Sequence, residues 1–218
     1  MTIDNDDLLN SIIASLGRID TISLDELPNI DLYMDQLTSF MNERLKKTAR
    51  HPDTDKILTK TMINNYSKND LLPTPEKKKY TKEHLILLIY IYYCKNFLSI
   101  SDIQTLIEPM RDRFGVSPDE LSVSDIYENS FELQKEALQS VMDDIEKKYN
   151  RATKTYADAD ISNEEKKRLQ LLSFMTLLLQ DVYVKKLIME KILDNIKDDE
   201  EKPAEKQKPS NKDKKKKG

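Results

Sequence analysis

The stretch that decides the fold of this chain is residues 58–103, LTKTMINNYSKNDLLPTPEKKKYTKEHLILLIYIYYCKNFLSISDI. Its first part predicts a helix that begins at Lys60, because the hydroxyl of Thr59 can accept a hydrogen bond from an amide of the first turn. Leu58 and Ile63, which flank this cap, form a hydrophobic staple that fixes the direction of entry. The pattern therefore predicts a short helix with a defined start, followed by a turn and a second helix.

The side chains of this first helix divide into two faces on a period of 3.6 residues. Met62, Ile63 and Tyr66 lie towards one side and are apolar or aromatic. The opposite face carries polar and basic side chains and no carboxylate: Lys60, Thr61, Asn64, Asn65 and Lys68. Hydrogen-bond donors flanked by positive charge are what a helix needs to read DNA.

Two prolines interrupt the helical pattern after this helix. Pro73 and Pro75 exclude a regular helix, so the basic run at 76–79 must turn in solvent. Thr81 can cap a second helix, which is expected to reach about Phe97. This helix is apolar on most sides and should therefore lie at the centre of its domain.

The order of these features resembles the N-terminal domain of MerR-type transcription regulators. In those proteins a tyrosine, a leucine pair, a proline, a basic wing and a second tyrosine follow one another. The matching residues here are Tyr66, Leu71, Leu72, Pro73 and Tyr80. A more literal resemblance, through LTKTMINNY and the pattern LLP-P-KK-Y, is to an uncharacterised bacterial family described only as a domain of unknown function with a MerR-like helix-turn-helix.

This resemblance covers about residues 27–107 and implies a winged helix-turn-helix domain that binds double-stranded DNA. Three features depart from the MerR pattern. Asp70 stands where a turn glycine is usual, the wing is short and lacks the usual Gly-Tyr-Arg, and a long connection precedes Lys60. These departures concern the role of the wing more than the fold.

The expected DNA-binding site consists of polar, basic and aromatic residues from the helix and the turn: Lys60, Thr61, Asn64, Asn65, Tyr66, Lys68, Lys77, Lys78, Lys79 and Tyr80. The two asparagines can pair with N6 and N7 of adenine, and the lysines suit phosphates or guanine. The turn lysines occupy the wing position, where they would meet the DNA backbone or the minor groove. For Tyr66 and Tyr80 two interpretations stay open, because the resemblance places them at the DNA-facing edge and their spacing also suits core packing.

The composition favours a mainly α fold, since only three glycines occur and tryptophan is absent. The net charge of −4 conceals a strong asymmetry. Residues 1–43 hold one basic and nine acidic residues, whereas residues 44–82 hold eleven basic and four acidic residues. A local basic block is typical of a surface that binds a polyanion. The alternative interpretation is a solvated lysine-rich surface.

The residues needed for most enzymatic or metal chemistry are missing from the sequence. It contains no glycine-rich phosphate loop, no HExxH and no CxxC pair. Cys94 is the single cysteine, so it forms no internal disulfide, and neither His51 nor His84 has a partner at ligand spacing. We therefore expect no enzyme, no metal and no cofactor. The run 85–94 is too short to span a bilayer and no signal sequence is recognisable, which predicts a cytoplasmic protein.

The remaining patterns predict four regions. Residues 1–26 contain a short amphipathic helix, and residues 27–110 form the MerR-like domain, in which Asp31 caps a helix to about Lys47. Residues 117–197 form a long helical hairpin, which is introduced by a capping box at Ser117 and whose first long helix is expected from about Ser124 to Tyr156. Residues 198–218 form a disordered lysine-rich tail. The helix at 31–47 should bury a stripe of apolar residues: Ile30, Met34, Leu37, Met41 and Leu45.

The second helix of the hairpin, from a cap at Ser162 to about Ile196, carries more apolar surface than one partner helix can cover. We infer packing against a second subunit; the alternative is that this surface covers the N-terminal domain. The leading hypothesis is a homodimeric, sequence-specific DNA-binding transcription regulator, a repressor by expectation. The alternatives are a helical adaptor for protein partners, whose helix-turn-helix does not bind DNA, and a regulator that senses a small-molecule effector.

Overall fold

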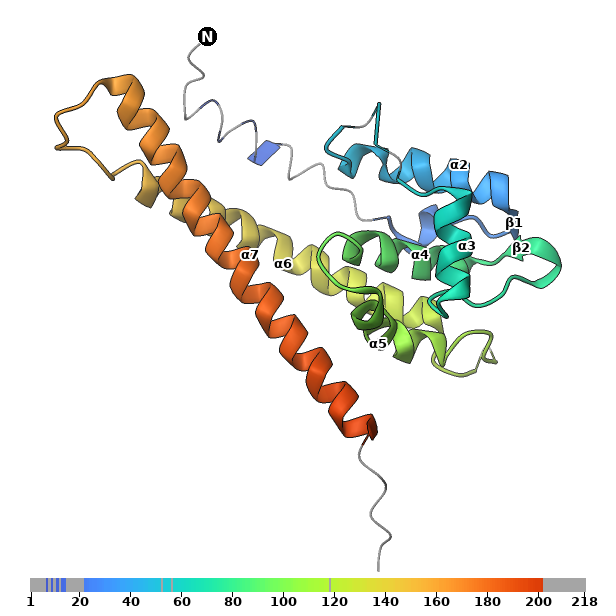
Figure 1. Cartoon of the computed structure of the whole chain (residues 1–218). Helices are drawn as coiled ribbons and strands as arrows, with labels where there is room; N and C mark the ends of the chain where they lie inside the picture. Colours follow the sequence, from blue (N-terminus) through green and yellow to red (C-terminus); the bar gives the residue numbers. More distant parts are fainter. Residues whose placement is uncertain are drawn as a thin grey trace, which may run out of the picture.

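The computed structural model of the chain describes residues 7, 9, 11, 13, 14, 22–51, 53–55, 57–117 and 119–201. Within them the protein is mainly helical, as expected, with one antiparallel pair of two-residue strands (Figure 1). The strands are β1 (Leu32–Tyr33) and β2 (Lys79–Tyr80). The helices are α2 (Met34–Leu45), α3 (Lys60–Lys68), α4 (Lys82–Cys94), α5 (Ile100–Arg111), α6 (Val123–Ala152) and α7 (Asn163–Glu201), with short 3-10 helices η1 (Leu24–Glu26), η2 (Lys46–Thr48) and η3 (Glu76–Lys78).

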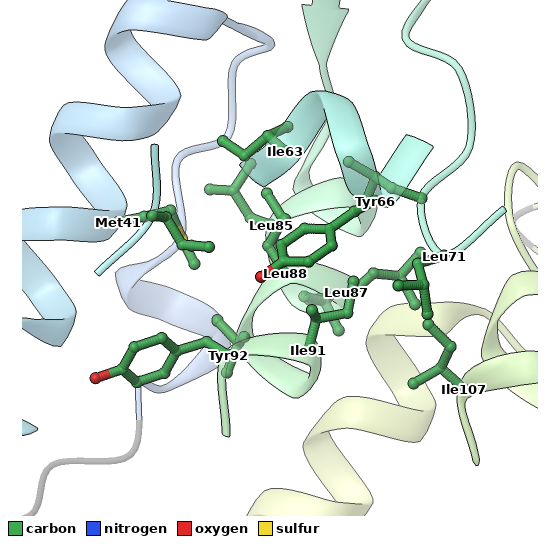
Figure 2. Packing of buried hydrophobic residues seen from close by; sticks show 14 of the residues in the cluster. Met41, Ile63, Tyr66, Leu71, Leu85, Leu87, Leu88, Ile91, Tyr92 and Ile107 are labelled. Carbon is green, nitrogen blue, oxygen red and sulfur yellow. The ribbon is translucent and has the colours of Figure 1, made fainter. Parts of the chain in front are cut away.

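Helix α4 forms the centre of the main hydrophobic core (Figure 2). Its run from Leu85 to Ile89 is buried throughout, which explains why this helix is apolar on most sides. Helix α2 contributes buried side chains to this core, and α3 contributes Ile63 and Tyr66. Full burial of a leucine or isoleucine contributes about 2 kcal/mol, so this cluster is the main source of stability in the domain.

The predicted helix starts at Thr59, Thr81 and Ser162 are confirmed. The hydroxyl of Thr59 accepts a hydrogen bond from the Met62 amide at 3.2 Å, and the Ser162 hydroxyl accepts one from the Glu165 amide at 3.2 Å. Helix α4 follows Thr81 but ends at Cys94, three residues before Phe97, the predicted end. After Cys94 the chain forms a turn, in which the amides of Phe97 and Leu98 both donate to the Cys94 carbonyl, and α5 then starts behind its own cap Ser99.

Two predicted starts are wrong. Asp31 does not cap α2, because Leu32 and Tyr33 extend as β1 and pair with Tyr80 and Lys79. The stripe of α2 therefore begins at Met34, its later positions Leu37, Met41 and Leu45 are buried, and Ile30 is 70% exposed. The capping box at Ser117 forms a turn instead of a helix start, whereas α6 starts at Val123, one residue before the predicted Ser124, behind a capping box made by Ser122 and Asp125. Val123 is fully buried, so its place in the core selects this second box.

Helices α6 and α7 form the expected hairpin (Figure 1). At its closed end the rings of Tyr149 and Phe174 meet edge to face with centroids 5.4 Å apart. Leu9 and Ile13 also pack there; the other residues of the predicted N-terminal stripe lie outside the described residues. Asp198–Glu201, which we expected in a disordered tail, form the last turn of α7, and residues 202–218 lie outside the described range.

The start of α6 belongs to the main core. Val123 and Tyr127 are buried in it, and the Tyr127 hydroxyl donates a hydrogen bond to the carbonyl of Ile22 at 2.5 Å. Leu193 of α7 reaches the same core from the other end of the hairpin. Among the described helices, none is long and apolar enough to cross a membrane.

Candidate nucleic-acid interface

The two faces of α3 are placed as the helical period predicts. Ile63 and Tyr66 are buried against the core, and the five polar or basic residues of the other face are all exposed: Lys60, Thr61, Asn64, Asn65 and Lys68. The helix is nine residues long, or about 14 Å at 1.5 Å per residue. A helix of this size, with a polar face free of carboxylates, fits the major groove of DNA.

Side chains from neighbouring helices hold both ends of α3. Before its first turn, Asn42 of α2 donates to the carbonyl of Leu58 at 3.0 Å and accepts from the amide of Leu58 at 3.4 Å. After its last turn, Gln104 of α5 donates to the carbonyl of Asn69 at 2.5 Å, and Arg111 of α5 donates to the carbonyl of Asp70. The polar face of α3 is therefore presented by a helix whose position is set before any ligand binds.

The turn after α3 depends on Asp70, which has a φ of 52°. This left-handed conformation favours glycine and is accessible to aspartate at moderate cost. The position is the one at which the resemblance led us to expect glycine. The conformation of the turn is thus the one that a glycine would adopt, and the aspartate adds strain without changing the path of the chain.

A tight turn carries the next group of basic residues. Lys77 and Lys78 both have positive φ, 47° and 63°, and the Lys79 amide donates to the carbonyl of Glu76. Two consecutive left-handed residues define a type I′ turn, which normally uses Asn-Gly. Lysine is costly at such positions, so the surrounding fold must offset the strain at Lys77 and Lys78.

The strand pair fixes this turn to the rest of the domain. Lys79 pairs with Tyr33 across the ladder, and its ammonium group lies 5.8 Å from the centre of the Tyr33 ring. Tyr80 pairs with Leu32 and is buried. The three turn lysines consequently project from a short two-stranded unit next to α3, at the end of the protein remote from the α6–α7 turn (Figure 1).

His84 connects the loop that leads into this turn with the start of α4. Its Nδ1 accepts a hydrogen bond from the Thr81 amide at 3.0 Å, so its Nε2 carries the proton and donates to the carbonyl of Pro73 at 3.2 Å. The ring is 2% exposed and packs edge to face against Tyr80 and Phe114. Burial lowers the pKa of His84 to about 4, although the bond to Pro73 acts in the opposite direction. The imidazole is therefore neutral at pH 7.

The basic residues of this surface differ in how strongly they are neutralised. Lys60 forms an ion pair with Asp35 of α2. Lys82 donates to the uncharged side chain of Asn29 at 2.7 Å, so its charge is not neutralised there. Lys68, Lys77 and Lys78 form no ion pair within the described part of the chain. The positive field available to a ligand thus comes mainly from the end of α3 and from the turn.

Of the ten residues expected at the site, eight are exposed and two are not. Tyr66 is 9% exposed and Tyr80 is 4% exposed, and both belong to the main core. Desolvation raises the pKa of both hydroxyls. The core-packing interpretation of these tyrosines is therefore correct, and we withdraw them from the contact surface. Figure 2 shows the Tyr66 ring directed towards Leu88.

Sequence reasoning missed the residues that support the site. Asn42, Gln104 and Arg111 act on α3 through contacts that are distant in sequence, and no local pattern marks them. His84 did carry a signal, because it stands at the third helical position after the cap Thr81. Among the described residues, no group of three or more His, Cys, Asp or Glu side chains is placed to hold a metal ion.

The described residues define a mainly helical protein in which a small strand-braced domain presents a basic surface and a long hairpin extends away from it. The chain matches the family described as Domain of unknown function (DUF1836) over residues 22–131, half of its length, and it belongs to this family. The match begins just before η1, contains α2 to α5 and ends within α6. No curated protein and no solved structure matches the chain.

Proposed function

We propose that this protein is a cytoplasmic, sequence-specific DNA-binding transcription regulator that acts as a homodimeric repressor, with α2 and α3 as a MerR-like helix-turn-helix. The observation that carries the proposal is the polar face of α3, which is exposed, has no carboxylate and is held at both ends by α2 and α5. The turn at Lys77 and Lys78 serves as the wing. The pairing of β1 with β2 supports this comparison, because it ties the wing to the strand that precedes α2.

In this proposal the exposed residues have separate roles. Asn64 and Asn65 read base edges in the major groove, because an amide side chain can bind adenine through two hydrogen bonds. Lys68, Lys77 and Lys78 contact phosphates and contribute to affinity for any sequence. A homodimer would present two copies of α3 to a palindromic site, with half-sites about one DNA turn apart.

The test is a fluorescence titration with fragmented DNA from the source genome and with a random duplex, at several salt concentrations. Retained fragments are sequenced. We expect enrichment of a few palindromes and a fall of log affinity with log salt of about 0.9 per neutralised phosphate. Weak binding of equal strength to every duplex, without enrichment, would refute sequence-specific regulation and favour the adaptor hypothesis.

Two variants separate base reading from phosphate binding. Asn64→Ala should cost about 1–3 kcal/mol on the enriched sequence and much less on the random duplex. The double variant Lys77→Asn, Lys78→Gly keeps a type I′ turn while removing two charges from each subunit, so it should weaken binding to all sequences and lower the salt slope of the dimer by about four. Lys135→Ala, an exposed lysine of α6, is the matched control and should leave both quantities unchanged.

A second candidate function, regulation by a small molecule, is favoured by a cavity of about 390 Å³ between α4, α5 and α6. Its lining is largely apolar and aromatic and includes Tyr90, Leu106, Tyr127 and Phe131. Tyr93 also lines it, and its buried hydroxyl has no hydrogen-bond partner within the described residues. An apolar compound with one polar group would fit such a site. A thermal-shift screen should find stabilising compounds whose effect is lost in Leu106→Trp, and the absence of any hit would argue against sensing.

A further inference from the structure

Helix α7 carries a large apolar surface that the rest of the described chain leaves uncovered. Eleven of its large apolar side chains are exposed: Leu172, Met175, Leu179, Val182, Tyr183, Val184, Leu187, Ile188, Met189, Ile192 and Ile196. From their exposed fractions this surface is on the order of 1,000 Å², whereas a stable dimer buries about 800 Å² on each partner. The exposed area, summed over all sides of α7, is therefore comparable to what one partner of a stable dimer buries.

The intrachain contacts of α7 lie in its first half and near its end. In its first half, Phe174 packs against Tyr149 of α6, and Asp181 accepts an ion pair from Lys148 at 2.6 Å. Near its end, Leu193 is buried in the main core and Lys197 binds Asp102 of α5 at 2.8 Å. Between residues 182 and 192 nearly every side chain is exposed or half-buried, and α7 continues as a separate rod past α6 (Figure 1). A rod that is apolar on several sides requires more than one partner helix.

A regular seam runs along α7, and all of its residues except Leu193 are exposed or half-buried. Spacings of three and four residues alternate over about three and a half heptads. The positions are Leu172, Met175, Leu179, Val182, Lys186, Met189, Leu193 and Ile196. All eight positions are apolar except Lys186, which is bound to Glu190 of the same helix at 2.6 Å. Leu193 is buried in the main core of its own chain. This spacing keeps one face of a helix in contact with a partner helix over its whole length.

We propose that a second copy of this chain covers α7, with the two α7 helices packed antiparallel about a two-fold axis near Val184. The seam is symmetric about this position. Leu172 lies as far before it as Ile196 lies after it, and the same holds for Leu179 with Met189 and for Val182 with Lys186. A two-fold axis at Val184 therefore places these exposed or half-buried residues opposite one another, while Met175 comes opposite Leu193, which its own chain already buries.

The charges favour the antiparallel arrangement over the parallel one. In a parallel pair Lys186 would face its own copy, whereas in the antiparallel pair it faces Val182 and keeps its bond to Glu190. The charges at the two ends of α7 also favour the antiparallel arrangement. The acidic run 198–201 would lie opposite the basic run 166–168 of the second copy, instead of against an identical acidic run.

The hairpin of the second copy also supplies its helix α6, which can cover a second face of α7. The exposed side chains Val184, Ile188 and Ile192 continue the face of α7 that packs on α6 in its first half. Leu133 and Val141 of α6 are themselves exposed. Two hairpins joined in this way form a four-helix bundle in which α6 of each copy covers this continuing face of the other. The proposal does not depend on DNA binding by α3.

The first test is the mass of the full-length protein in solution, measured by light scattering over a range of concentrations. We expect twice the mass of one chain. Leu179→Glu should raise the dissociation constant of the dimer roughly a hundredfold or more, because each dimer would bury two unpaired carboxylates. Leu179 is 69% exposed in the single chain, so circular dichroism of this variant should be unchanged. Gln180→Glu, an adjacent exposed position outside the seam, carries the same charge change and should remain dimeric.

The direction of the helices is tested by disulfide formation. Leu172→Cys protein mixed with Ile196→Cys protein should give the mixed disulfide, and neither protein alone should cross-link, since equal positions would lie about 36 Å apart. The native Cys94 does not interfere, because it is buried and burial raises the pKa of its thiol to about 11. A monomer at all concentrations, a dimer indifferent to Leu179→Glu, or self-linking of Leu172→Cys would overturn the proposal.

Discussion

His84 gives a stability prediction that can be worked out from the structure. The neutral ring accepts a hydrogen bond from the Thr81 amide and donates one to the Pro73 carbonyl, so protonation would remove the acceptor at Nδ1. The pKa of His84 is lowered from 6.5 to about 4 because the ring is buried. The unfolded chain therefore binds more protons than the folded chain between these two pH values.

The sign of the effect follows from this difference. A lowered pKa in the folded state gives a contribution that is fully present above pH 6.5, falls as the pH is lowered towards 4, and changes little below that. The size is set by a difference of about 2.5 pKa units at 1.36 kcal/mol each, or roughly 3 kcal/mol over the whole window. Carboxyl groups titrate in the lower part of this range, so the effect must be measured as a difference between two proteins.

The suitable comparison is His84→Gln, which retains an amide donor and acceptor but cannot be protonated. At pH 7 the variant should be less stable than the wild type, because it loses the ring contacts with Tyr80 and Phe114. Urea unfolding followed by circular dichroism between pH 7.5 and 4 should show this gap closing by roughly 3 kcal/mol. Two stability curves that stay parallel over the window would show that His84 is not buried in neutral form.

Other substitutions test local features of the fold by urea unfolding at pH 7. Asp70→Gly should raise the free energy of unfolding by roughly 1 kcal/mol, since φ is 52°, whereas Asp70→Ala should not; an equal effect of both would contradict the strain. Thr59→Ala should lower the free energy of unfolding by about 1 kcal/mol, and Thr59→Ser should be nearly neutral. If Thr59→Ala were also neutral, the hydrogen bond from the Met62 amide would not stabilise the helix. Leu88→Ala, at a fully buried position, should lower the free energy of unfolding by about 2–5 kcal/mol; a loss below 1 kcal/mol would place Leu88 outside the core.

The sequence predicts those parts of the fold that depend on neighbouring residues. The cap at Thr59 and the cap at Ser162 are made within one turn of their helices, so their signals are complete in the local sequence. The strand pair is not of this kind, because two-residue strands have no measurable period and Tyr33 finds Lys79 only in the folded chain. The capping box at Ser117 fits the local pattern, as does the one at Ser122, so local sequence does not distinguish them. The helix starts behind Ser122, where Val123 is buried in the core.

The same distinction applies to the candidate interface. The period of α3 predicts its exposed face, because a helix assigns each residue to a side by spacing alone. It does not predict that Tyr80 is buried, since the pairing with Leu32 determines that. Nor does it identify Asn42 or Gln104, whose side chains bind backbone groups at the two ends of α3.

Helix α5 links the candidate interface to the proposed dimer helix. Gln104 and Arg111 hold the end of α3, and Asp102 on the same helix binds Lys197 of α7. Hydrogen bonds from Lys197 and Ser99 lower the pKa of Asp102, so this carboxylate stays ionised well below neutral pH. If both proposals hold, the distance between the two copies of α3 in the dimer is set through one twelve-residue helix with contacts on both sides. The spacing of DNA half-sites would then be a property of α5 packing as much as of the α7 seam.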